Sequence, residues 1–465
     1  MAEFSAGEVI EIAAARNLVE GAAVTALKRS ISTDTRTLEH GQWYLALSGE
    51  IHDGHKFVPN AIARGAGGCI VSRTEDEWLK AAKAAGCAIL QVDNTLSSYQ
   101  ELATSWRRKI NPVVIGITGS SGKTTTKEMV AAAVRLGLRY HKSQANENNE
   151  IGVPKTILSM PSDSQVLIVE MAMRGLGQIA ELAKTALPDV GIITCAGTAH
   201  IELLGSVENI VKAKCELLEY LDPQKGLAII GAPTDLLRKR IKEIYSGKTV
   251  FCEPGSVEET AVLPQVTKFK IRGCDVEFKI RAHGAYHMQD VWCAIVAAHQ
   301  AGVAYEEIAE GLKNYAPVEG RGTRLELKSG AVVVDESYNA NPESVRCAVE
   351  ALLDSRAFPF DKKYVILGEM AELGETAEAA HYDLGKWLSG QAVTMLVTVG
   401  EKAAVIADGA RGAAFTIKAC RDQKEAEEVV RRELSKDACV MVKGSHCANL
   451  DKLVESLVAS EQAVS

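Results

Sequence analysis

The sequence lacks the features of a secreted or membrane-spanning protein. No apolar run approaches the roughly 18 consecutive residues of a spanning helix. No basic segment followed by an apolar core stands at the start of the sequence. The 11 cysteines are irregularly spaced and form no C-x-x-C pair, which is typical of reduced, mostly buried thiols. We therefore expect a cytoplasmic protein with no membrane span.

The chain also lacks an excess of positive charge. Its 52 Lys and Arg residues are outnumbered by 60 Asp and Glu residues, for a formal net charge of -8. This charge argues against a general polyanion-binding surface, so we expect no nucleic-acid partner, while a local basic pocket for a phosphorylated ligand is compatible with it. Aromatic residues make up only 5% of the chain, but 47% of all residues are hydrophobic. At 465 residues, the chain has the length of roughly three domains.

The most informative stretch is VVIGITGSSGKTTTKEMV, residues 113–130. An apolar run of the buried-strand type leads into a turn of Gly and Ser, and a helix-compatible segment opens at Lys123. A turn without bulky side chains lets successive backbone N–H groups converge on a phosphate. Lys123 would then reach the terminal phosphates and the Thr124 hydroxyl would bind magnesium. The stretch predicts a variant phosphate-binding loop, and an ordinary turn before a helix is the alternative.

Strands and helices alternate along most of the chain. This alternation predicts an α/β fold with a largely parallel sheet covered on both faces, in which ligands collect at the carboxyl ends of strands. We place domain boundaries near residues 108 and 318. The expected domains are a small α/β N-terminal domain (1–108), a central domain like the P-loop NTPases with a mostly parallel sheet (109–318), and a Rossmann-like, doubly wound C-terminal domain (319–465).

Several polar residues fall after predicted strands of the central domain. Glu170 ends an apolar strand, where its carboxylate would bind magnesium opposite Thr124 or be a solvated acid. His200 follows the next strand, and a lone histidine is more often structural. A solvated helix face is the simplest interpretation of Lys212 and Lys214.

Two polar segments have an equally open interpretation. The loop KSQANENNEIGVP is rich in short amides and suits either turns or a substrate clamp. Near the N-terminus, polar clusters flank the strand around Trp43 and form either a small-molecule rim or surface turns.

Taken together, these segments resemble the Mur ligase family, and within it the branch that adds D-alanyl-D-alanine. GITGSSGKTT resembles the family's phosphate loop, and NENNEIGVP, EMAMRGLG, AHIELLGS with AKCE, DESYNANP, GEMAELGE and KGS resemble further motifs in the family's order. NENNEIGVP and DESYNANP are the most specific of them. The resemblance runs from about residue 32 to about residue 450, which is nearly the whole chain.

The resemblance implies an ATP-dependent amide ligase. It would add D-alanyl-D-alanine to UDP-N-acetylmuramoyl-tripeptide through an acyl phosphate, using ATP and two magnesium ions, and it would act as a monomer. The implied catalytic residues are Lys123, Glu170, His200 and Lys214, and the implied metal ligands are Thr124, Glu170, His200 and, once carbamylated, Lys214. The implied ATP contacts are Gly119, Ser120, Ser121, Gly122, Lys123, Thr124, Thr125, Arg321 and Asp335. The implied substrate contacts are Ser32, Thr35, Arg36, Ser48, Asp53 and His55 for UDP, Asn146, Asn148, Asn149 and Glu150, and Tyr338, Asn339 and Asn341 for the dipeptide.

The sequence departs from the family pattern near the expected adenine site. His287 is present, but Met288 and Val291 stand where the family usually has asparagines. Three other functions were weighed. One is a ligase that adds a different amine, such as diaminopimelate, although the Asp-Asn-Pro-Arg motif of that branch is absent. Another is a folylpolyglutamate synthetase. A P-loop kinase or nucleotide-binding module is the third, and it leaves the asparagine-rich motifs unexplained.

Overall fold

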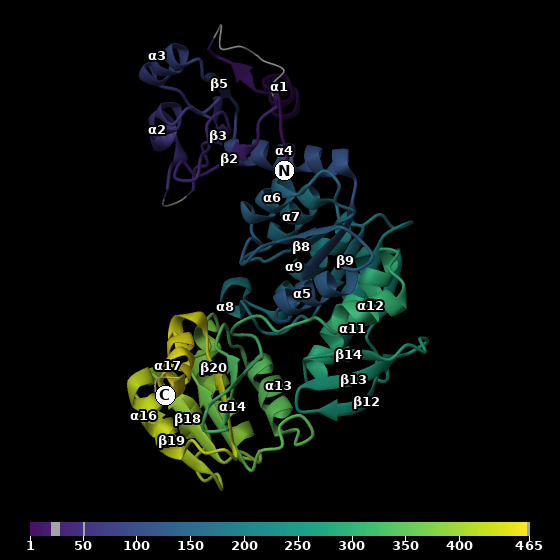
Figure 1. The fold of residues 1–465 in the computed structure, drawn as a ribbon, viewed down its shortest axis with the longest axis vertical. Helices are drawn as coiled ribbons and strands as arrows, with labels where there is room; N and C mark the ends of the chain where they lie inside the picture. Colours follow the sequence, from purple (N-terminus) through teal and green to yellow (C-terminus); the bar gives the residue numbers. More distant parts are fainter. Residues whose placement is uncertain (20–27, 50–51, 463–465) are drawn as a thin grey trace.

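The computed structural model describes residues 1–19, 28–49 and 52–462. The described strands form four sheets of five, six, three and six strands. Figure 1 shows an elongated molecule in which the N-terminal part, the six-stranded sheet of the central part and the C-terminal part follow one another along the long axis, with the three-stranded sheet beside the C-terminal part. We use these three names for the regions around the five-stranded sheet, around the first six-stranded sheet with the three-stranded sheet, and around the last six-stranded sheet.

The N-terminal part contains a sheet of order β1-β5-β4-β3-β2, parallel except for the β1–β5 pair. Helix α4 leads out of it and packs against α6 and α7 of the central part. Arg107 on α4 fixes this contact, because its guanidinium donates to Asp189 Oδ2 over 2.9 Å. The elements are α1 (Ala6–Ala13), β1 (Arg16–Asn17), β2 (Ile31–Ser32), β3 (Trp43–Leu45), η1 (Gly54–Phe57), α2 (Val58–Ala63), β4 (Gly68–Val71), α3 (Asp76–Ala85), β5 (Ala88–Gln91) and α4 (Thr95–Ile110).

The central part contains a parallel sheet of order β11-β10-β9-β6-β8-β7. All residues of β8 and β9 are buried, as expected for strands covered on both faces. The elements are β6 (Val113–Thr118), α5 (Lys123–Val134), β7 (Tyr140–Lys142), α6 (Gly152–Ser159), β8 (Val166–Glu170), α7 (Gln178–Ala186), β9 (Val190–Ile193), α8 (Ile201–Leu204), α9 (Val207–Cys215), η2 (Glu216–Tyr220), β10 (Leu227–Ile230), α10 (Asp235–Ile244) and β11 (Lys248–Phe251). A small antiparallel sheet and two helices follow, namely β12 (Val257–Leu263), β13 (Val266–Ile271), β14 (Phe278–Ile280), α11 (Ala285–Gln300) and α12 (Tyr305–Leu312).

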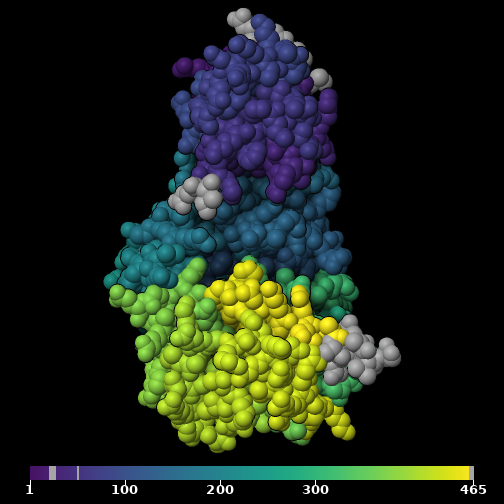
Figure 2. Space-filling view, turned by 90° about the vertical axis from the view of Figure 1, so that its left-hand side faces the viewer, coloured from purple at the N-terminus to yellow at the C-terminus, as the bar shows by residue number. Residues whose placement is uncertain are grey.

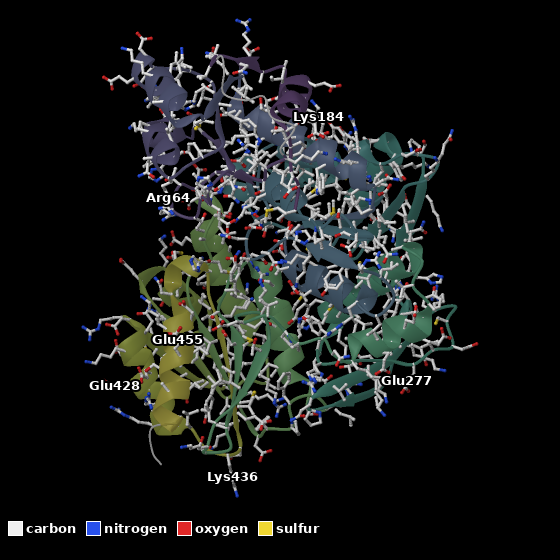
Figure 3. The ribbon with its side chains drawn as sticks, turned by 45° about the horizontal axis from the view of Figure 1, so that its top comes forward. Arg64, Lys184, Glu277, Glu428, Lys436 and Glu455 are labelled. Carbon is white, nitrogen blue, oxygen red and sulfur yellow. The ribbon has the colours of Figure 1, made fainter. Side chains whose placement is uncertain are left out.

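The C-terminal part contains a sheet of order β15-β16-β20-β17-β18-β19, in which only the β15–β16 pair is antiparallel. Charged side chains such as Glu428 and Lys436 project from its outer side (Figure 3). The elements are β15 (Thr323–Glu326), β16 (Val332–Glu336), α13 (Pro342–Leu353), β17 (Lys362–Leu367), η3 (Gly374–Thr376), α14 (Ala377–Leu388), β18 (Met395–Val399), α15 (Glu401–Gly409), β19 (Thr416–Cys420), α16 (Gln423–Glu433), β20 (Ala438–Lys443), η4 (His446–Ala448) and α17 (Leu450–Gln462).

The predicted α/β fold with mostly parallel sheets is confirmed. Strand β16 runs through Asp335 to Glu336, so both carboxylates lie at its carboxyl end. All 11 cysteines are free thiols. Within the described ranges, every helix is too short or too polar to cross a membrane.

Candidate active site

A cavity of about 980 Å³ lies between the central and C-terminal parts. Figure 2 shows these two parts in contact along a broad boundary. The cavity wall includes segments that follow β6, β8 and β9 on one side and β16 and β17 on the other, together with residues of α11. The carboxyl ends of two parallel sheets therefore face the same cavity, which is where ligands are expected to bind in such sheets.

The predicted phosphate loop forms one wall of this cavity. Gly122 has a left-handed backbone (φ 78°), and a Cβ there would lie 2.6 Å from Asp290 Oδ1, so a larger residue would not fit. Helix α5 begins at the next residue, Lys123, and its N-terminus faces the cavity. Lys123 Nζ donates to Gly119 O over 2.7 Å, and burial lowers the pKa of this lysine. The loop thus combines a glycine turn, a helix N-terminus and a lysine, which is the chemistry of an anion site.

Glu170 lies next to this loop and is buried, with 2% of its surface exposed. The hydroxyl of Thr124 donates to its Oε2 and the amide of Asn148 donates to its Oε1, each over 2.9 Å. Lys127 Nζ lies 3.6 Å from the same Oε2. The interpretation of Glu170 as a solvated acid is therefore wrong. A hydroxyl and a carboxylate side by side are ligands that Mg²⁺ accepts together with phosphate oxygens and water.

Lys214 behaves differently from its neighbour Lys212. Lys212 is exposed on α9, whereas Lys214 is completely buried and its Nζ has no hydrogen-bond partner among the described residues. Burial, and next the nearby charge of Lys123, lower the pKa of Lys214 far below the usual lysine value. The solvated-face interpretation is therefore wrong for Lys214, and burial favours the neutral form of its amine.

His200 lies at the cavity edge in the segment between β9 and α8. Its Nδ1 is 2.6 Å from Glu372 Oε2 of the C-terminal part. The described residues contain no cluster of three or more His, Cys, Asp or Glu side chains arranged like a metal site. The metal ligands expected from the sequence would therefore be completed by the substrate phosphates and water rather than form a closed protein cage.

The C-terminal wall carries Arg321 and the residues after β16. The Arg321 guanidinium lies 4.0 Å above the Tyr338 ring, and Asn339 and Asn341 line the same wall. Asn341 also accepts a hydrogen bond from Ser344 N over 2.8 Å, so it caps α13. Asp335 is buried and accepts hydrogen bonds from Gly320 N and Ser337 N, each over 3.0 Å. It shapes the turn while its neighbour Glu336 lines the cavity.

Sixteen of the predicted site residues line this cavity: Ser120, Ser121, Gly122, Lys123, Thr124, Thr125, Asn146, Asn148, Asn149, Glu150, Glu170, His200, Arg321, Tyr338, Asn339 and Asn341. Asn149 also accepts from Gly152 N over 2.9 Å, so the turn interpretation holds for this residue as well. Outside the described lining are Gly119, Lys214, Asp335 and the six N-terminal residues Ser32, Thr35, Arg36, Ser48, Asp53 and His55.

The N-terminal residues form a separate polar cluster. His55 is fully buried, its Nδ1 lies 2.7 Å from Asp53 Oδ1, and its Nε2 accepts from Ser72 N over 2.9 Å. Arg73 donates to Asp53 Oδ2 over 2.8 Å, and this contact is the largest cause of a lowered Asp53 pKa. His55 is thus placed to orient Asp53 rather than to touch a ligand itself.

Several cavity residues escaped the sequence analysis, namely Arg174, Tyr286, Asp290, Glu336, Glu343 and Glu372. On α11, Met288 and Val291 pack in the core, whereas His287 and Asp290 line the cavity. Asp290 accepts from Thr126 Oγ1 over 3.0 Å, and burial raises its pKa to about 8. The i, i+3 spacing of His287 and Asp290 on one helix face was the available signal.

Three protein-family models match consecutive parts of the chain. The Mur ligase family catalytic domain matches residues 29–104, the Mur ligase middle domain residues 117–298, and the Mur ligase glutamate ligase domain residues 320–446.

Similar proteins extend over nearly the whole chain. The UDP-N-acetylmuramoyl-tripeptide--D-alanyl-D-alanine ligase of Bacillus subtilis is 32% identical over 92% of this chain and 93% of its own. The ligase of the same name from Synechocystis is 35% identical over 92% of both chains. A crystal structure of MurF from Acinetobacter baumannii superimposes with a TM-score of 0.87 at 28% identity, over 98% of this chain and 99% of that one. MurF ligase from Thermotoga maritima in complex with ADP gives a TM-score of 0.81 at 25% identity, over 94% of this chain and 99% of that one.

Proposed function

Because this chain belongs to the Mur ligase family, we propose that it is the ATP-dependent ligase that joins D-alanyl-D-alanine to UDP-N-acetylmuramoyl-tripeptide. The observation that carries the proposal is the shared cavity, in which a phosphate loop faces the asparagine-rich end of a second sheet. The product is the UDP-linked pentapeptide precursor of peptidoglycan. Since both nucleotide substrates belong to the cytoplasm, we place the reaction there.

The reaction has two steps. The terminal carboxylate of the tripeptide attacks the γ-phosphate of ATP, which gives an acyl phosphate and ADP. The amine of D-alanyl-D-alanine then attacks the acyl carbon, and the C–O bond to phosphate breaks as the amide forms. Both steps depend on positioning and charge neutralisation rather than on a covalent protein nucleophile.

The central part provides the phosphate chemistry. The N–H groups of the loop, Lys123 and the N-terminus of α5 bind the phosphates, and Arg321 approaches from the other wall. Thr124, Glu170 and His200 would hold magnesium, which supplies positive charge to the phosphate oxygens when bound. Burial favours the neutral form of the unpaired Lys214 amine, which is the form that reacts with CO₂, and the resulting carbamate would add an anionic oxygen ligand.

The remaining substrate contacts divide between the other parts. Tyr338 and Asn339 would receive the dipeptide, with Asn341 acting mainly through the helix it caps. On α11, His287 and Asp290 would face the nucleotide base, since Met288 and Val291 point into the core. The polar cluster around Asp53 would bind the UDP group of the nucleotide-linked peptide.

A ligase with another amine acceptor is the second candidate, because the phosphate chemistry would be the same. The decisive experiment is phosphate release from ATP with UDP-N-acetylmuramoyl-tripeptide, with D-alanyl-D-alanine, D-alanine or L-amino acids as acceptors. We expect release that requires the dipeptide, and a pentapeptide product by mass. Release that requires a different amine would move the function to another branch of the family.

A further inference from the structure

The segment that carries His200 is held by two carboxylates of the C-terminal part. Thr198 donates to both oxygens of Glu343, from its backbone N over 3.1 Å and from its hydroxyl over 2.9 Å. Two residues further on, His200 Nδ1 lies 2.6 Å from Glu372 Oε2, and Glu202 N donates to Glu372 O over 3.3 Å. The two acids come from different elements, since Glu343 is in the first turn of α13 and Glu372 lies between β17 and η3.

Both partners of the closest contact have an unusual backbone. His200 has φ 67° and Glu372 has φ 61°, which is the left-handed region that residues other than glycine rarely adopt. Such conformations persist only where the surroundings impose them, and they cluster at functional sites. Here two of them meet across the boundary between two parts of the molecule, so the geometry of this pair is imposed from both sides.

Glu372 places a carboxylate oxygen 2.6 Å from the ring nitrogen Nδ1 of His200. A carboxylate at Nδ1 fixes the imidazole orientation and leaves Nε2 free as a metal ligand. Glu372 itself belongs to the C-terminal wall of the cavity. The orientation of the metal-binding histidine therefore depends on the position of the C-terminal part.

We propose that Glu372 is a positioning residue for the metal site, and that docking of the C-terminal part, reinforced by Glu343, orients His200 for the metal ion. This inference rests on the proposed metal role of His200. It extends the proposed function, because binding of the metal ion would be coupled to closure of the C-terminal part over the central part.

The test is Mn²⁺ binding in the presence of ADP, followed by electron paramagnetic resonance, with no acceptor present. Mn²⁺ replaces Mg²⁺ as the probe because it accepts oxygen and imidazole ligands and its free form is directly measurable. We compare the full-length protein with Glu372→Gln, Glu372→Asp and Glu343→Gln. Glu375→Gln is the matched control, because Glu375 is an exposed glutamate three residues further on, in η3.

We expect Glu372→Gln to weaken Mn²⁺ binding about 10- to 100-fold, as for other carboxylates that orient a ligating histidine. Glu372→Asp keeps the charge but moves it away from His200, because the aspartate side chain is shorter. This variant and Glu343→Gln should give smaller losses of Mn²⁺ affinity. Glu375→Gln should bind Mn²⁺ as tightly as the native protein does. ADP binding without metal should be equal in all variants, which shows that each is folded.

Two results would overturn the inference. Unchanged Mn²⁺ affinity in Glu372→Gln would remove Glu372 from the metal site, and a raised KM for the dipeptide in the same variant would assign it to the acceptor instead. Equal losses of Mn²⁺ affinity in Glu372→Gln and Glu375→Gln would mean that the effect comes from the general surface charge and not from the contact with His200. Failure of the native protein to bind Mn²⁺ with ADP would instead contradict the proposed function, so the two failures are distinguishable.

Discussion

The two six-stranded sheets place their polar residues at the same cavity but support them differently. In the central part the supporting contacts are internal, as between Lys123 and Gly119 or between Glu170 and Thr124. In the C-terminal part Asp335 and Asn341 also have internal contacts, but Glu343 and Glu372 contact residues of the central part. The same architecture therefore gives one wall that is preorganised and one that depends on how the two parts dock. We expect phosphate binding to be a property of the first wall, and completion of the reaction to require the second.

The strongest test of the preorganised wall is Lys123→Ala. Removing the lysine leaves developing charge on the phosphates uncompensated, so phosphate release should fall about 1,000-fold. The matched control is Lys184→Ala, because Lys184 is exposed on α7 and labelled on the outside of the molecule in Figure 3. Near-normal turnover in Lys123→Ala would show that ATP does not bind at this loop.

Lys214 tests whether a buried group behind the same wall contributes through a negative charge. Lys214→Ala should lower turnover about 10- to 100-fold, as for other groups that support a metal site. Added formate or acetate should restore part of the activity by occupying the place of the carbamate. An unmodified lysine in fully active protein, seen by intact mass under conditions that preserve carbamates, would contradict this.

The dipeptide wall is tested by two neighbouring asparagines with different contacts. Asn341→Ala removes the cap of α13 and should lower the free energy of unfolding by about 1 kcal/mol. Asn339 is exposed; its side chain accepts from Ala340 N over 2.9 Å, and only its backbone O, which the substitution keeps, accepts from Lys443 Nζ over 3.0 Å, so Asn339→Ala should raise the KM for D-alanyl-D-alanine at nearly unchanged stability. Urea unfolding and acceptor kinetics measure the two effects. A raised KM in Asn341→Ala together with a lowered stability in Asn339→Ala would mean that the two residues have the opposite roles.

The smallest expected effect is a pH dependence at Asp290. Its pKa is about 8 in the folded protein, well above the value near 4 of an unfolded aspartate. Between these values the folded state binds more protons, so its contribution to stability is complete below about pH 4 and is lost as the pH rises through about 8. From pH 5 to pH 9 the Tm of Asp290→Asn should therefore fall roughly 2 to 4 °C less than that of the native protein. Parallel Tm curves would show that Asp290 is not buried in its acid form.

The same comparison explains what the sequence could predict. The preorganised wall was predictable, because the phosphate loop and Glu170 follow strands at short, local spacings. The fold class followed from the alternation of elements. Burial of Lys214 was not visible, since a lysine at a helical position reads as solvated until tertiary packing covers it.

The contacts of the C-terminal wall with the central part were less predictable, for a related reason. Glu343 and Glu372 gain their partners only where the C-terminal part meets the central part, at sequence separations that no local pattern records. Asp335 shows the converse, since a residue inside a matching motif turned out to hold a turn rather than to line the cavity.

The most direct test of the account is the path of one oxygen atom. If UDP-N-acetylmuramoyl-tripeptide carries ¹⁸O in its terminal carboxylate, the acyl phosphate transfers one of these atoms to the released phosphate. We predict singly labelled phosphate together with a UDP-linked pentapeptide, both only when D-alanyl-D-alanine is present. Unlabelled phosphate would mean that ATP is cleaved by water, and would contradict activation of the carboxylate at this cavity.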